Sequence, residues 1–93
     1  SSDKKSIRQL ENFVNRYKGN IMTTIRTHLP NLNEMDYRLL CYLCAGFSAK
    51  AISIFTGDST NNIYVKKSRI KDIIVELKDE NVKREILEAI TVR

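Results

Sequence analysis

Two cysteines, Cys41 and Cys44, stand at a spacing that can bind zinc or carry out thiol–disulfide exchange. They lie beside Leu40 and Leu43, and the chain offers neither a second cysteine pair nor a nearby histidine. We therefore interpret both cysteines as small core residues, and no metal site is expected. Two cysteines three positions apart on a helix also favour a reducing compartment over a structural disulfide, which indicates a cytoplasmic location.

The single histidine, His28, would need a nucleophile or carboxylate partner to act as a general base, and nothing in the chain identifies one. A cation suits the end of the first predicted helix, where His28 lies. The sequence contains no glycine-rich phosphate loop, no paired-carboxylate motif and no cluster of metal ligands. We therefore expect a protein that is not an enzyme, with no catalytic residue and no cofactor.

The basic residues of the second half indicate a polyanionic partner. The chain has 16 Lys and Arg against 11 Asp and Glu, a net charge of +5. Residues 60–71 contain four cations and no acid, whereas acids gather near the end of the chain. One predicted helix therefore holds the positive field. Its cations are Lys66, Lys67, Arg69 and Lys71.

Two successive helix starts precede this basic stretch. Ser48 can cap a short helix that Gly57 ends, and Ser59 can cap a longer helix over about 60–78. Two helices crossing over so short a turn need a small residue where they touch, such as Ser53, and a turn residue that tolerates positive φ, such as Gly57. This is the sequence form of a helix-turn-helix, whose second helix lies in the DNA major groove.

The longer helix has two distinct faces at 100° per residue. Ile63, Ile70 and Ile74 fall on one side, and small or polar residues fall on the other. Short side chains would let the backbone approach base edges, while the flanking cations reach phosphates. The candidate base-facing residues are Asn61, Tyr64, Val65 and Ser68.

The remaining segments predict helices as well. A leading helix is expected over roughly 5–28, begun by a capping box at Ser6 and Gln9 and ended by Pro30. A second helix begins at Asn33 and ends at Gly46, and a short closing helix begins at Asn81. Strand and hairpin signals are poor. The prediction is an all-α domain of five helices. Its leading helix would pack on its own module or form a homodimer.

Residues 32–77 resemble a known family. The segments that carry the likeness are Leu32–Glu34, Gly46–Ser53, Gly57–Ser59, Asn62–Tyr64 and Ser68–Ile70. They are similar to the LuxR/GerE-type helix-turn-helix, whose topology is close to that of region 4 of bacterial sigma factors. In particular they look like the variant at the C-terminus of Bacteroidetes regulators, in which a helical segment precedes the motif.

This resemblance implies sequence-specific binding of double-stranded DNA by the output domain of a bacterial transcriptional regulator. Tyr64, Val65 and Ser68 match the base-facing positions of the family, and Lys67 and Arg69 would contact phosphates. From the residues themselves we add further candidate phosphate contacts. They are Lys50, Ser59, Lys66 and Lys71.

We thus expect a leading helix in residues 1–31, a trihelical helix-turn-helix in 32–78 and a closing helix in 79–93. No apolar run approaches the ~20 residues of a membrane span, so no membrane contact is expected. An alternative is a protein-interaction module that uses the same fold to dock on RNA polymerase, a sigma factor or a sensor partner.

Overall fold

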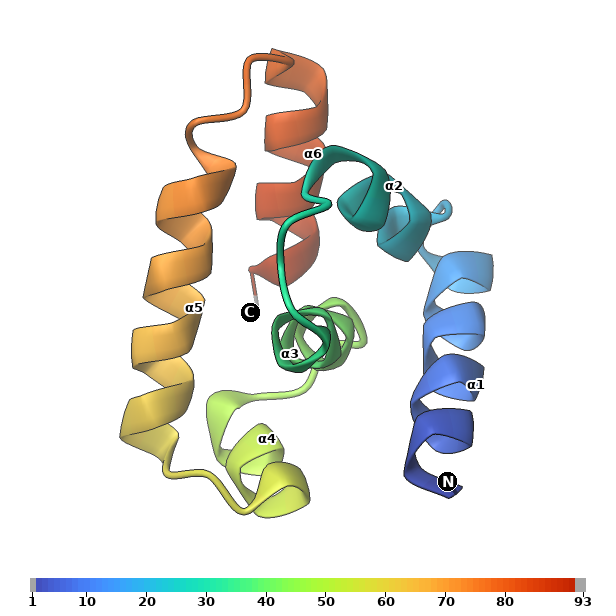
Figure 1. Cartoon of the computed structure of the whole chain (residues 1–93), viewed down its shortest axis with the longest axis vertical. Coiled ribbons are helices and arrows are strands. Elements are labelled where there is room, and N and C mark those ends of the chain that lie inside the picture. Colours follow the sequence, from blue (N-terminus) through green and yellow to red (C-terminus); the bar gives the residue numbers. More distant parts are fainter. Residues whose placement is uncertain (1, 92–93) are drawn as a thin grey trace.

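The computed structural model describes residues 2–91, with side chains from Lys4 onward, and these residues form six α-helices and no strand. The expected all-α class is therefore confirmed for the described part of the chain. Figure 1 shows α5 along one side of the molecule, α1 along the opposite side and α3 between them. The helices are α1 (Ser2–Tyr17), α2 (Ile21–His28), α3 (Glu34–Cys44), α4 (Ala49–Thr56), α5 (Thr60–Ile74) and α6 (Glu80–Ile90).

The leading segment holds two helices where the sequence predicted one, so the expectation of a long leading helix and five helices in all was wrong. The break lies at Gly19 and Asn20, which both have φ of +60°. The Asn15 side chain, on α1, caps the first turn of α2. Its Oδ1 accepts hydrogen bonds from the backbone N–H groups of Met22 (2.8 Å) and Thr23 (3.3 Å). At the other end, α1 begins before Ser6, so Ser6 does not cap it.

Helix α3 runs through the centre and is buried on almost every side. Asn33 begins it with a capping box, in which its Oδ1 accepts from the Asp36 N–H at 2.8 Å and Asp36 Oδ2 accepts from the Asn33 N–H at 3.3 Å. Leu39 to Cys44 are all buried. The Tyr37 hydroxyl donates to the Leu29 carbonyl at 2.5 Å and ties α3 to the end of α2. Because α3 packs against α1, α2, α5 and α6, it organises the core.

The last two helices differ from the predicted boundaries by a few residues. Helix α5 ends at Ile74, four residues earlier than expected. Helix α6 begins at Glu80, because Asp79 accepts hydrogen bonds from two backbone N–H groups of the first turn. Ile86 and Ile90 of α6 then pack into the same core as the helices before it. Among the described residues, no helix is both long and apolar enough to cross a lipid bilayer.

Candidate nucleic-acid interface

Helices α4 and α5 are joined by a turn whose capping residues are those the sequence predicted. Ser48 Oγ accepts from the Ala51 N–H at 3.1 Å, and Ser59 Oγ accepts from the Asn62 N–H at 3.0 Å. Gly57 ends α4 with φ of +74°. Glycine adopts this left-handed backbone conformation at little cost because it has no Cβ. Gly57 therefore allows the chain to turn sharply from α4 into α5.

A polar network of side chains holds the same turn. Asp58 Oδ1 accepts from the Ser59 N–H and from Asn62 Nδ2, each at 3.0 Å, and Asp58 Oδ2 pairs with Lys66 Nζ at 2.6 Å. The Lys66 ammonium group therefore holds the pKa of Asp58 below its usual range. Thr56 completes the network by accepting from the Asp58 N–H at 3.2 Å. The start of α5 is thus fixed by hydrogen bonds as well as by packing.

The two faces of α5 are arranged as its sequence predicted. The inner isoleucines Ile63, Ile70 and Ile74 have exposed fractions of 2%, 0% and 0%. On the outer side, Tyr64 and Val65 are 60% and 59% exposed. Asn61 and Ser68 are exposed as well, so no part of the described chain covers the candidate base-facing residues. We call Asn61, Tyr64, Val65 and Ser68 the outer face of α5.

The candidate phosphate contacts have unequal surroundings. Lys50 on α4 and Lys71 on α5 are exposed. Lys67 is half-buried, and this partial loss of solvent, together with the neighbouring charge of Lys71, lowers the pKa of its ammonium group. Ser59 uses its hydroxyl as a helix cap, and Lys66 is paired with Asp58 as described above. Lys50 and Lys71 are therefore the candidate cations that are best placed to contact a phosphate.

Arg69 has a structural partner that the sequence did not reveal. Its Nη2 donates to Asp36 Oδ1 at 2.5 Å. The Asp36 side chain is only 7% exposed, whereas the Arg69 side chain is 49% exposed. Because Asp36 also belongs to the capping box of α3, this ion pair fastens α5 to the first turn of α3. Arg69 thus holds the candidate interface in place and still reaches the surface.

The cysteine pair is placed as the core interpretation expected. Cys41 and Cys44 are free thiols with exposed fractions of 0% and 1%, and burial raises the pKa of each to about 12. A thiolate is the form that binds metals and attacks disulfides, so both groups remain in the unreactive form at neutral pH. The described residues hold no group of three or more His, Cys, Asp or Glu that could bind a metal ion.

Sequence reasoning missed the carboxylates that pair with these cations. Asp58 and Lys66 are eight residues apart and meet across the turn between α4 and α5. Asp36 and Arg69 are separated by 33 positions, so no local pattern could have indicated their contact. The only available signal was Asp36 itself, an acid in the first turn of a helix whose second half is apolar.

The chain matches no protein-family model, and no curated protein or solved structure is significantly similar to it. Its function must therefore be argued from the geometry of its own residues.

Proposed function

We propose that this domain binds double-stranded DNA by placing α5 in the major groove. The observation that carries the proposal is the outer face of α5, which stays open to solvent while the opposite face supplies the core. A helix used for groove recognition has to protrude in this way. The resemblance to the LuxR/GerE-type helix-turn-helix supports the same assignment and adds the role of an output domain in a transcriptional regulator.

Each residue of the outer face offers a different kind of base contact. The Asn61 amide can donate and accept at adenine, and Val65 can contact a thymine methyl group. The hydroxyl groups of Tyr64 and Ser68 can donate to or accept from a base edge. Lys50 and Lys71 would contact phosphates beside the groove, which fixes register without reading sequence.

Fluorescence anisotropy with a duplex of random sequence, over a series of salt concentrations, tests the electrostatic part of this proposal. We expect Lys71→Ala to weaken binding to every sequence and to lower the slope of log K against log salt by about 1. Lys78→Ala removes the same charge from an exposed position beyond the end of α5 and serves as the matched control. Equal slopes for the two variants would remove Lys71 from the contact set.

Selection of bound duplexes from a random library tests base reading. Ser68→Ala or Tyr64→Ala should alter the selected sequence, whereas Lys71→Ala should leave it unchanged and weaken binding generally. A library that shows no enrichment with the unaltered domain would exclude sequence-specific recognition. An enriched sequence with two half-sites would support a homodimer on DNA.

A protein-interaction module is the second candidate, and one observation favours it. Besides Tyr64 and Val65, two apolar side chains near the end of α5 are exposed, Ile73 at 39% and Val75 at 45%. The exposed acid Asp72 precedes Ile73, and two cations of α5 are already paired with carboxylates. A partner such as RNA polymerase, a sigma factor or a sensor would use this surface without affinity for random duplex at low salt, so the first experiment separates the two functions.

A further inference from the structure

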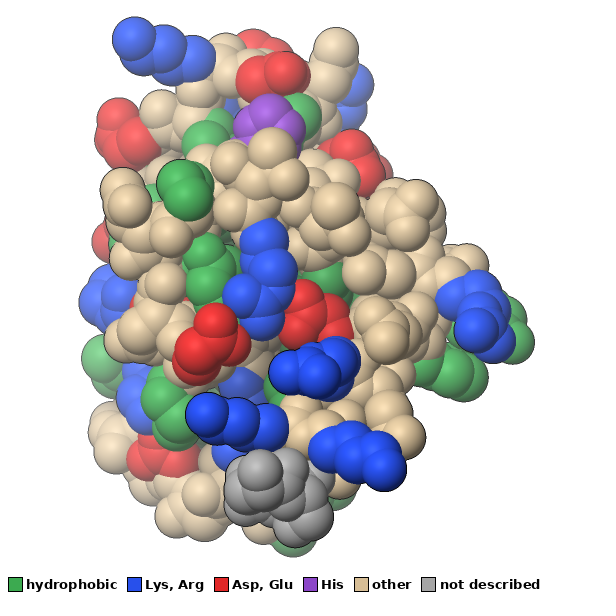
Figure 2. Space-filling model, turned by 45° about the vertical axis from the view of Figure 1, so that its right-hand side comes forward, with side chains coloured by type: hydrophobic (Ala, Val, Ile, Leu, Met, Phe, Trp, Pro, Cys, Tyr) green, Lys and Arg blue, Asp and Glu red, His purple; other side chains and the backbone are tan. Residues whose placement is uncertain are grey.

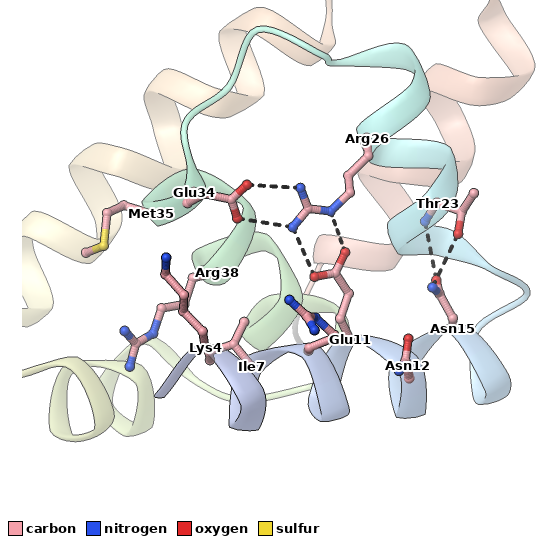
Figure 3. Close-up of a pocket in the computed structure, with 11 residues that line it drawn as sticks. Lys4, Ile7, Glu11, Asn12, Asn15, Thr23, Arg26, Glu34, Met35 and Arg38 are labelled. Atoms are coloured by element: carbon pink, nitrogen blue, oxygen red, sulfur yellow. Dashed lines mark hydrogen bonds and ion pairs between the residues drawn. The ribbon is translucent and has the colours of Figure 1, made fainter. Parts of the chain in front are cut away.

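A groove on the other side of α3 lies between α1, α2 and α3 (Figure 3). Its volume of about 710 Å³ is within the range of about 300–1,000 Å³ that is usual for ligand sites. Arg26 lies between two carboxylates there: its Nε and Nη2 donate to Glu11 at 2.6 and 3.1 Å, and its Nη1 and Nη2 donate to Glu34, each at 3.2 Å. The guanidinium carbon also sits 4.2 Å from the centre of the Tyr37 ring. Arg26 is thus a fixed part of the groove.

The groove continues into a second depression. This smaller one, about 350 Å³, lies between α3 and the turn that joins α4 and α5. Met35 and Arg38 of α3 line both depressions. The two form one furrow across this side of the molecule, which we call the α3 furrow.

The larger part of the α3 furrow is positively charged. Its lining has four cations and two carboxylates, a net charge of +2, and Arg26 already engages both carboxylates. Lys4 and Arg8 line it from α1, and Arg38 lines it from α3. Figure 3 shows Lys4 and Arg38 on these two walls. Figure 2, which turns the α1 side forward, shows Lys and Arg side chains gathered over the lower half of this face. The furrow therefore complements an anion.

Apolar side chains line the furrow as well. Met35 is 58% exposed where the two depressions meet, and Ile7 lines the groove from α1. A flexible, exposed methionine is suited to apolar contact with a peptide. A phosphate backbone would gain nothing from Met35, so the mixture favours a peptide over a nucleic acid.

We propose that the α3 furrow binds an acidic, amphipathic segment of a partner protein. Carboxylates of the segment would meet Arg8 and Arg38, and an apolar side chain between them would pack on Met35. The α1 wall of the furrow lies on the side of the molecule opposite α5 (Figure 1), and the smaller part of the furrow reaches Ile63 and Lys66 of α5. No residue of the outer face of α5 lines either depression, so the two surfaces are separate. The proposal therefore does not depend on DNA binding.

The test uses the full chain and a fluorescein-labelled peptide of sequence EELLEELLEE in an anisotropy titration. Arg8→Glu should weaken binding about five- to thirtyfold, because a favourable charge pair becomes a repulsive one. Arg16→Glu makes the same change at an exposed position of the same helix, outside the furrow, and should change affinity less than twofold. Met35→Ser should weaken binding severalfold, whereas Ile54→Ser, at an exposed position of α4, should have little effect.

Three results would overturn the proposal. The first is equal weakening by Arg8→Glu and Arg16→Glu, which would mean that the peptide responds only to overall charge. The second is the absence of any effect of Met35→Ser. The third is an Arg8→Glu variant that loses affinity for a random duplex but keeps its affinity for the peptide. That result would indicate that the furrow binds nucleic acid. If substitutions on α5 did not change the affinity for DNA, the peptide results would be unaffected. Each proposal can therefore be refuted without refuting the other.

Discussion

Replacing Arg69 by methionine should lower the free energy of unfolding by about 2 kcal/mol. The substitution keeps most of the apolar stem but leaves the Asp36 carboxylate, 7% exposed, without its charged partner. Removing one member of a fully buried pair costs about 3–5 kcal/mol, whereas an exposed pair contributes about 0.2–1 kcal/mol. The Asp36–Arg69 pair has one buried and one half-exposed member, so its value lies between these limits.

A double-mutant cycle in urea isolates the contribution of the contact. Asp36→Asn retains an oxygen that can accept from the Asn33 N–H and should cost about 1.5 kcal/mol. If the pair links α3 to α5, the double variant should be less destabilised than the sum of the single variants by about 1 kcal/mol. Arg16→Met, at an exposed position on α1, should stay within about 0.5 kcal/mol of the unaltered domain.

A coupling energy below about 0.3 kcal/mol would refute this reasoning. Arg69 would then contribute to the fold only through its stem, and its charge would be as available to a phosphate as that of Lys71. The same cycle therefore separates a residue that holds α5 from one that touches a ligand.

Three further predictions concern the core, the turn and pH. Ile70→Ala should cost about 2–5 kcal/mol in chemical denaturation, whereas Val65→Ala on the exposed side of the same helix should stay within about 0.5 kcal/mol. Gly57→Ala should cost about 1 kcal/mol and Gly57→Asn less, because φ of +74° strains a residue with a Cβ even where space is open. Since burial raises the pKa of Cys41 and Cys44 to about 12, the unfolded chain loses these protons first, and stability should fall as pH rises from about 9, by about 1.4 kcal/mol per pH unit for each thiol. Urea titrations at pH 8 and 10 should show a smaller fall for Cys44→Ala, and an equal fall would contradict the assignment.

Local signals predicted the fold well wherever a side chain caps its own helix. Asn33, Ser48 and Ser59 each accept a backbone hydrogen bond three residues ahead, and these contacts need no knowledge of the rest of the chain. The separation of the α5 faces was equally predictable, because helical periodicity alone places its isoleucines on one side.

The prediction of one leading helix failed because the apolar spacing continues across the break. Val14 and Ile21 are both buried although they lie on different helices. The sequence did carry a signal in Gly19 and Asn20, two neighbouring residues that tolerate positive φ.

The partners of the charged residues could not be predicted for a different reason. Arg69 looked like a free cation because its acid lies on another helix, and only the packing of α3 against α5 brings them together. The ion pair between Asp36 and Arg69 therefore depends on how α3 and α5 pack, which no local sequence pattern encodes.

The burial of α3 also decides how this chain can be divided. A fragment of residues 32–78 would contain the whole turn between α4 and α5 but would lack α1, α2 and α6, which cover most of α3. Part of the surface of α3 that is now buried would then face water in the excised piece. We therefore expect a fragment of residues 32–78 to be less stable than the whole chain, because the flanking helices support the helix on which α5 packs.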